Sequence, residues 1–365
     1  MITLEQAKVG MADKVDQAVI DEFRRGSLLL DRLIFDNAVS PGTAGSTLTY
    51  GYVKLLKPAT AKFRKLNEEY TANEATRKKA SADLKIFGGE FALDRVIINT
   101  SGAVDELDFQ MQEKIKAAIN LFHYTVINGD SSTNEDEFDG LAKLLKGSTT
   151  EFDDVYSKTA DKDVVAGKKY FTRTGEGTEE SPYVYEKVDE PNKTNIATYY
   201  EVSYVDLSTS KAMDDNYNEF LDMMNDFIAT MQGKPHMFLV NSKMATKMKG
   251  VARRAGYFSR QEDAFGRSVD MWDGIPIVDL EEYFDGETTK TCVPIDEDGY
   301  TSIYAVQIAK DGFHGVSPTG NNVISTALPD LKQPGVIKKG DVEMVSAVVL
   351  KNTLKAGVFK NIKVQ

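Results

Sequence analysis

Apolar residues recur at helical spacing in two long segments of the chain. Between residues 105 and 128 they keep to one face of a helix, which would measure about 36 Å at ~1.5 Å per residue. A second such segment runs from 213 to 232, and Gly233 is typical of the position that closes a helix. The repeating positions are Leu107, Met111, Ile115, Ala118, Ile119, Phe122 and Val126 in the first segment, and Tyr217, Phe220, Leu221, Met224, Phe227, Ile228 and Met231 in the second.

Shorter apolar runs predict strands around and after these helices. Ser242 is predicted to cap a helix that follows the first of them, and residues 257–273 read as a loop. Long helices mixed with strands that gather toward the C-terminus predict an α+β fold. The strand candidates are HMFLVN (236–241), GIPIVDL (274–280), IYAVQIA (303–309), VEMVSAVVL (342–350) and AGVFKNIKV (356–364).

The N-terminal hundred residues have a different pattern. Residues 3–37 favour a helix, and residues 38–47 form a turn-rich break. Residues 48–97 read as two arms around a polar tip near 68–76, with too little apolar content for a core of their own. Because an isolated two-stranded ribbon is marginally stable in water, we expect this element to pack on another molecule.

Tyrosines are concentrated in residues 155–203, where short strand candidates alternate with a Gly-rich turn. We interpret this stretch as a small β domain inserted into the chain. Its aromatic side chains could bind a sugar or another surface protein. The interpretation that we favour is that they fill the core of the small domain.

Charge and cysteine content narrow the function. Basic residues number 44 and acidic residues 56, a net charge of −12, which argues against nucleic-acid binding and against anionic membrane surfaces. The single cysteine, Cys292, excludes an intrachain disulfide framework and a multi-cysteine zinc site. The N-terminus has no signal-like apolar region, and no apolar run is long enough to span a membrane, so we expect synthesis in the cytoplasm.

Residues with catalytic potential are few. His314 lies near Ser317 but without a G-x-S-x-G motif, and we interpret it as a loop histidine; His123 is interpreted as packed or at an interface. The acidic run from Glu135 to Asp139 could hold a hard cation, although a solvated loop is favoured. We therefore expect no catalytic, cofactor or metal site and no enzymatic activity.

The order of these parts resembles the major capsid proteins of tailed bacteriophages, which have the HK97-type fold. No single motif is specific, but their order and spacing are. Four segments carry the resemblance: the helix 105–128 with the exit INGDSSTNEDEFDGL (127–141), FLVNSKMATKMKGV (238–251), MWDGIPIVDLEEY (271–283), and KGDVEMVSAVVLKNTLKAGVFKNIKV (339–364).

The resemblance implies a division of the chain. Residues 1–47 would be an N-terminal arm, and 48–97 an extended β-hairpin loop (E-loop) lying over a neighbouring subunit. Residues 98–154 and 305–365 would form the peripheral domain with the spine helix 105–128. Residues 204–304 would form the axial domain, and 155–203 would be an added β domain on the outer surface.

The resemblance also implies a function and partners. The chain would assemble through hexamers and pentamers into an icosahedral or prolate shell that encloses double-stranded DNA without sequence-specific binding, assembled in the host cytoplasm and found in the virion. A separate scaffolding protein and a portal are expected, and a decoration protein stays open. The alternatives are the shell of a bacterial nanocompartment with the same fold and a carbohydrate-binding surface protein. Cross-linking between a loop lysine and an asparagine, known in some relatives, is not expected here, although the chain has the residues: Lys62, Lys65, Lys78, Lys79, Asn352 and Asn361.

Overall fold

The chain divides into two compact units. Unit 1 comprises residues 1–144, 280–292 and 307–352, and unit 2 comprises 145–279, 293–306 and 353–365. The C-terminal strand therefore groups with unit 2, whereas the resemblance assigned it to the peripheral domain. The computed structural model describes residues 26–38, 47–57, 59–61, 63–70, 74–100, 106–152, 156–159, 162–164, 170–175, 184–188, 190–202, 205–256, 258–262, 268–318, 323–330 and 332–365.

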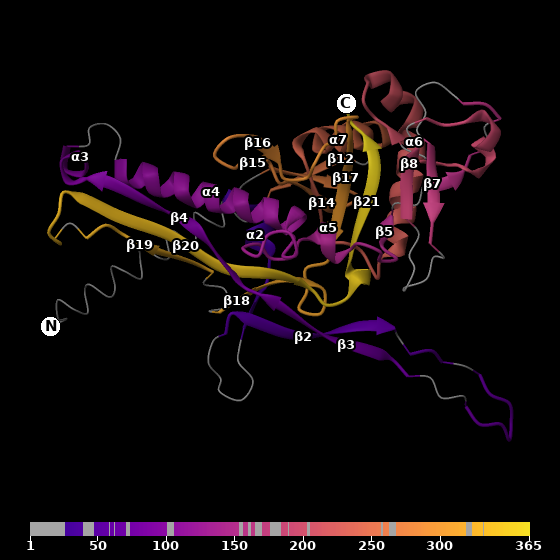
Figure 1. Ribbon diagram of the computed structural model, residues 1–365, viewed down its shortest axis with the longest axis horizontal. Coiled ribbons are helices and arrows are strands. Elements are labelled where there is room, and N and C mark those ends of the chain that lie inside the picture. Colours follow the sequence, from indigo (N-terminus) through magenta and orange to yellow (C-terminus); the bar gives the residue numbers. More distant parts are fainter. Residues whose placement is uncertain are drawn as a thin grey trace. The chain divides into compact units, whose positions relative to one another are not determined.

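Unit 1 is built on a long strand, β20 (Ile337–Leu350), which pairs along both of its edges (Figure 1). Strand β4 (Lys85–Asp94) runs antiparallel to it on one edge. On the other edge lie β18 (Phe313–Ser317) and β19 (Ile324–Ala327), and β1 (Phe35–Asn37) adds to β18 in parallel. The unit also contains α2 (Leu28–Arg32), α3 (Arg95–Thr100), α5 (Leu141–Leu144) and the hairpin β15 (Glu282–Phe284) with β16 (Thr289–Thr291).

The predicted long helix is confirmed as α4 (Glu106–Asn128), which packs on β4 and β20. Its core-facing residues are nearly fully buried from Ile115 onward, and the Phe122 ring stacks 6.2 Å from that of Phe87 on β4. Leu107 and Met111, in its first turns, are only half-buried. The C-terminal half of the helix therefore carries the packing.

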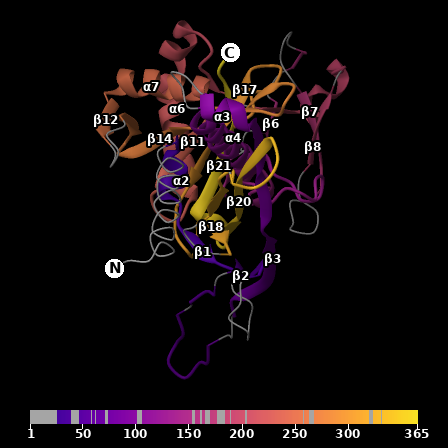
Figure 2. The same cartoon turned by 90° about the vertical axis from the view of Figure 1, so that its left-hand side faces the viewer.

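The predicted ribbon is shorter than residues 48–97. Strands β2 (Thr49–Lys57) and β3 (Thr76–Asp83) form a two-stranded antiparallel hairpin that extends away from the sheet of unit 1 (Figures 1 and 2). Residues 85–94, which were expected to continue its second arm, pair with β20 instead. The alternation that buries Phe91 and Leu93 of this segment explains the difference, since a buried row needs the core of the sheet.

Unit 2 contains an eight-stranded mixed sheet. Its order is β10-β21-β17-β11-β14-β13-β12, and β5 pairs with β21. The strands are β5 (Glu151–Phe152), β10 (Val205–Asp206), β11 (Met237–Val240), β12 (Phe258–Glu262), β13 (Ser268–Trp272), β14 (Ile275–Asp279), β17 (Tyr300–Val306) and β21 (Ala356–Lys363), with a 3₁₀ turn, η2 (Thr353–Lys355), before the last.

Two helices pack on this sheet and share one apolar core with it. The second predicted helix is confirmed as α6 (Ser210–Thr230), whose buried residues include Phe220 and Phe227. Helix α7 (Ser242–Ala255) follows β11 and ends at Gly256 in the left-handed conformation. The predicted cap Ser242 is wrong by one residue. Asn241 accepts from the Met244 amide at 2.8 Å, and its amide nitrogen donates to the Val293 carbonyl and to the Thr301 hydroxyl on β17, which fixes the side chain.

The loop predicted at 257–273 is largely wrong. Strands β12 and β13 pair antiparallel, and the Arg260 side chain on one strand bonds Asp270 on the other at 2.8 Å. Val269 and Met271 alternate toward the interior. The many charged residues of this stretch concealed the alternation.

The tyrosine-rich stretch forms a four-stranded antiparallel sheet of its own, in the order β6-β9-β7-β8. Tyr170, Ile196 and Tyr199 form a small buried cluster there. These residues support the interpretation that tyrosines fill a small core. The elements are β6 (Tyr156–Lys158), β7 (Tyr170–Thr174), β8 (Val184–Val188), η1 (Lys193–Thr198) and β9 (Tyr200–Val202).

The α+β class is confirmed by this mixture of helices and sheets. Most of the helix expected at 3–37 lies outside the described residues. Of its described part, 28–32 is the short helix α2 and 35–37 is the strand β1.

Candidate assembly surface

The β2–β3 ribbon exposes apolar side chains that a soluble monomer would bury. No described side chain between residues 49 and 83 is buried. Val53 is 51% exposed, and Phe63, Leu66 and Tyr70 near the tip are between 66% and 108% exposed. Exposed apolar groups on a projecting element are typical of a surface that meets another molecule. The ribbon is therefore the first candidate for an assembly contact.

The base of the ribbon is tied to unit 1 by a polar cluster around Tyr50, the second residue of β2. Its hydroxyl donates to Asp36 of β1 at 2.9 Å and accepts from the Lys351 ammonium group at 2.8 Å. Lys310 pairs with the same Asp36 at 3.3 Å. The His314 ring lies edge-on to the Tyr50 ring, with centroids 6.1 Å apart. Four separate segments thus fix where the ribbon leaves the body.

Burial and the neighbouring charges shift the pKa values of three groups at the base of the ribbon. Burial and the neighbouring Asp36 carboxylate raise the pKa of Tyr50, so its hydroxyl stays a donor. Burial opposes ionisation of Asp36, but the bonds from Tyr50 and Lys310 outweigh it and lower its pKa. Burial and the Lys351 cation lower the pKa of His314, which keeps its ring neutral.

Sequence reasoning missed this cluster. Lys310 and Lys351 are 274 and 301 residues away from their partners at Asp36 and Tyr50. Single charged residues at such separations give no local pattern. Only the pairing of β1 with β18 and of β18 with β20 brings them together.

The loop that follows helix α4 depends on two glycines. The Gly140 amide donates to the Gly129 carbonyl at 2.8 Å and closes the loop on itself. A Cβ at Gly129 would lie 2.2 Å from the Phe138 carbonyl oxygen, and one at Gly140 would lie 2.6 Å from the Thr125 oxygen. Only glycine allows this close backbone approach, which explains the Gly-Asp…Gly-Leu pattern of the sequence.

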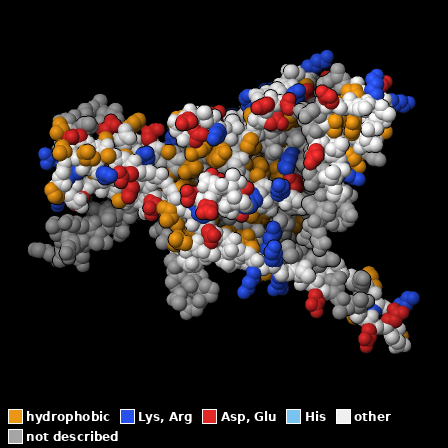
Figure 3. Space-filling view, in the orientation of Figure 1, with side chains coloured by type: hydrophobic (Ala, Val, Ile, Leu, Met, Phe, Trp, Pro, Cys, Tyr) orange, Lys and Arg blue, Asp and Glu red, His pale blue; other side chains and the backbone are white. Residues whose placement is uncertain are grey.

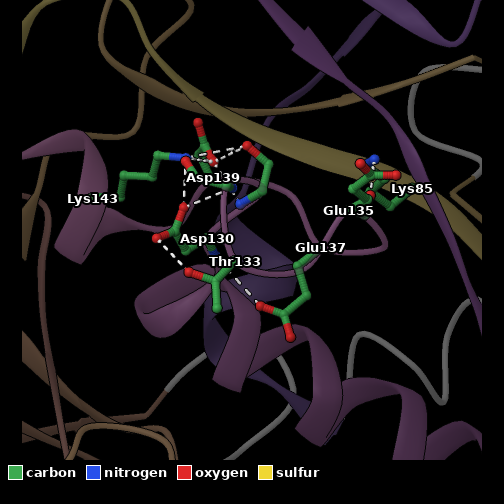
Figure 4. A network of polar contacts seen from close by, with 9 residues as sticks. Lys85, Asp130, Thr133, Glu135, Glu137, Asp139 and Lys143 are labelled. Carbon is green, nitrogen blue, oxygen red and sulfur yellow. Dashed lines mark hydrogen bonds and ion pairs between the residues drawn. The ribbon is translucent and has the colours of Figure 1, made fainter.

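The acidic loop between these glycines is organised by a lysine (Figure 4). The Lys143 ammonium group lies 2.6 Å from Asp130 and 2.8 Å from Asp139. The bond from Lys143 lowers the pKa of Asp130, and it also lowers that of Asp139 against the opposing effect of burial. Lys85 of β4 donates to the Glu135 carbonyl. Of the run from Glu135 to Asp139, in which a cation site was the alternative, Asp139 is therefore paired with a side-chain ammonium group, together with Asp130.

Two of the three histidines, His123 and His314, are buried. His123 is buried and lies between the Ser27 hydroxyl at 2.6 Å and the Leu280 carbonyl at 3.2 Å, so its interpretation as a packed histidine is confirmed.

His314 is not in a loop. It lies fully buried in β18, next to Gly315, where an added Cβ would lie 2.4 Å from the Phe35 ring. Ser317 is three residues further along the strand and points to the opposite face, which excludes a Ser–His pair.

Two kinds of feature are absent from the part of the chain that the structure describes. No group of three or more His, Cys, Asp and Glu side chains in this part of the chain is arranged to hold a metal ion. No helix among these residues combines the length and the apolar character needed to cross a membrane.

Comparisons with known proteins give structural likeness alone. No family model and no curated protein matches the sequence. Among solved structures, the holo-SrpI encapsulin complex from Synechococcus elongatus is 12% identical, with a TM-score of 0.50, covering 93% of this chain and 88% of that one. Mycobacterium phage Bobi gives 10% identity and a TM-score of 0.48, covering 92% and 90%. The capsid of Myoviridae phage XM1 gives 12% and 0.45, covering 91% and 90%.

The encapsulin likeness covers nearly the whole chain, both units included. At 12% identity it establishes the fold and nothing of the partners or contents. The chain therefore has the HK97-like shell fold that its sequence resembles.

Proposed function

We propose that this chain is the major capsid protein of a tailed bacteriophage, a subunit that assembles with copies of itself into a closed shell. The observation that carries the proposal is the ribbon, which projects from unit 1 with exposed apolar side chains and no core. Such an element is stabilised when it lies on a second copy. A fold shared with a shell protein over most of the chain supports this.

Within this proposal the regions take the roles that the resemblance implied. Residues 48–83 act as the inter-subunit arm, and residues 1–47 act as the N-terminal arm. The spine helix α4 and β20 form the rigid body of the peripheral domain, and the sheet of unit 2 with α6 and α7 belongs to the axial domain. The β6–β9 sheet decorates the outer surface. A scaffolding protein and a portal complete the assembly, and the shell encloses double-stranded DNA.

The nanocompartment shell is the second candidate, because the SrpI encapsulin shares the fold over 93% of this chain. The two candidates differ in the contents and size of the particle. A phage capsid would be large and would need a scaffold, whereas a nanocompartment would be small, uniform and loaded with protein cargo.

Electron microscopy of the expressed full chain tests the proposal. We expect angular shells of phage size, formed with a co-expressed scaffolding protein. Small uniform shells formed by the chain alone would support the nanocompartment. A dispersed monomer under every condition would contradict both shell functions.

A further inference from the structure

The β2–β3 ribbon differs in charge from the rest of the chain. Residues 48–83 hold eight basic and four acidic side chains, a net charge of +4 in a chain of −12, which leaves −16 for the remainder. Four basic residues lie together on the paired strands. They are Lys54, Arg77, Lys78 and Lys79, which we call the basic row. Because successive side chains of a strand point to opposite faces, Arg77 and Lys79 lie on one face of the hairpin, and Lys54 and Lys78 lie on the other.

The basic row is poorly stabilised within its own subunit. Lys54 and Lys78 are directly opposite each other across the hairpin, an arrangement of like charges that destabilises a strand pair. Burial and the Lys78 cation lower the pKa of Lys54. None of the four basic residues forms an ion pair with any described residue. Lys and Arg side chains gather along the ribbon in the space-filling view (Figure 3). The row therefore lacks a counter-charge among the residues that the structure describes.

Helix α6 presents the opposite charge on its outer face. Asp215, Glu219, Asp222 and Asp226 are all exposed and follow each other at spacings of four, three and four residues. This spacing places them on one side of the helix, where like charges destabilise each other. We call them the acidic face. None of the four pairs with a described cation, although the adjacent Asp214 pairs with Arg254 at 2.5 Å.

We propose that Arg77 and Lys79, the two members of the basic row on one face of the ribbon, dock on the acidic face of α6 in a second copy of this chain. The inference rests on the proposed shell function and names the chemistry of one lattice contact. Among the described residues, neither the pair Arg77 and Lys79 nor the acidic face has an ion-pair partner, and each would gain its counter-charge from the other. A polyanion is a poorer occupant of the basic row, because the remainder of each chain carries a net charge of −16 and would repel it.

A charge swap tests the pairing. Arg77→Glu/Lys79→Glu should lower the yield of shells at least tenfold, and Glu219→Lys/Asp222→Lys should do the same. The four changes together should restore assembly to within threefold of the wild type, because they exchange the two signs. Lys146→Glu/Lys332→Glu, two exposed lysines outside the ribbon, is the matched control and should assemble as the wild type does.

A second measurement keeps the test independent of folding. The variant Lys79→Cys/Glu219→Cys should form disulfide-linked chains in oxidised shells, and its reduced form should run as a single chain. Cys292 is buried and does not compete.

The outcomes separate this inference from the proposed function. Two results would show that the proposed contact is wrong while the shell function stands. Either both double variants assemble as well as the wild type, or the variant with all four changes does not recover assembly. If the ribbon variants assemble normally and lose binding to double-stranded DNA instead, the basic row binds nucleic acid. If wild-type chains form no shells, both inferences fall.

Discussion

Single residues inside unit 1 set how it responds to acid. His123 accepts from Ser27 and donates to the Leu280 carbonyl, so the neutral ring has both nitrogens satisfied without a charge. Burial lowers the pKa of His123 from 6.5 to about 4, against the opposing effect of the Leu280 carbonyl. The folded chain therefore binds fewer protons than the unfolded chain between these pH values.

We predict that the free energy of unfolding is maximal above pH 6.5 and falls by up to about 3 kcal/mol as the pH drops to about 4 because of His123. His123→Gln, which offers a donor and an acceptor but does not titrate, should remove this part of the pH dependence. Urea unfolding at pH 7 and pH 5 measures it. His236→Gln, at an exposed position, is the control and should keep the wild-type difference in unfolding free energy between pH 7 and pH 5. If His123→Gln kept the wild-type difference between pH 7 and pH 5, His123 would not be the source of this pH dependence.

Glycine at the helix exit gives a second prediction at this scale. Gly129→Ala would place a methyl group 2.2 Å from a backbone oxygen, where nothing flexible can yield, so we expect a loss of roughly 1–3 kcal/mol. Gly51→Ala, on β2, meets nothing within 4 Å and is the control. Thermal denaturation of the unassembled subunits measures both. Equal stability of the two variants would show that the loop is not as tightly closed as described.

The elements show what a single sequence can and cannot predict. Helices α4 and α6 follow directly from apolar periodicity, because one continuous face of each is buried. The pairing of β4 with β20 was missed because it joins residues more than 240 positions apart, and no local signal marks such a partner. The polar cluster at Tyr50 was missed for the same reason. Segment type is thus local information, whereas partner choice and side-chain clusters depend on the tertiary fold.

The spine helix can be tested at a buried position. Ile115 is 3% exposed on the core side of α4, so Ile115→Asp would bury a carboxylate without a counter-ion at a cost of several kcal/mol. We expect no soluble folded protein. Lys116→Asp, one residue further and exposed, should remain soluble. Circular dichroism and the soluble fraction after expression measure both, and a folded, assembling Ile115→Asp variant would contradict the packing of α4.

The added β sheet can be tested by removing it. Lys158 and Tyr200 are paired neighbours on β6 and β9, so the two ends of the segment lie side by side. A short Gly-Ser linker replacing 158–201 can therefore close the gap with little strain. We expect this deletion to fold and to form shells, measured by electron microscopy. A folded deletion protein that never assembles would show that the sheet takes part in the lattice.

At the scale of the whole molecule, the β2–β3 ribbon is the element that the proposed assembly explains best. The ribbon has an exposed apolar tip and a basic row without a counter-charge among the described residues. Both features destabilise a monomer and would be stabilised by contact with a second copy. With a net charge of −12, the proposed assembly would depend on salt, because added ions screen the repulsion between copies together with any attraction between unlike patches.

A cryo-electron-microscopy map of particles assembled from the full chain tests the central claim most directly. The account predicts closed shells in which the β2–β3 ribbon of each copy lies on a neighbouring copy, with Phe63 and Leu66 buried there. A map in which the ribbon folds back on its own subunit, or projects into solvent without contact, would contradict it.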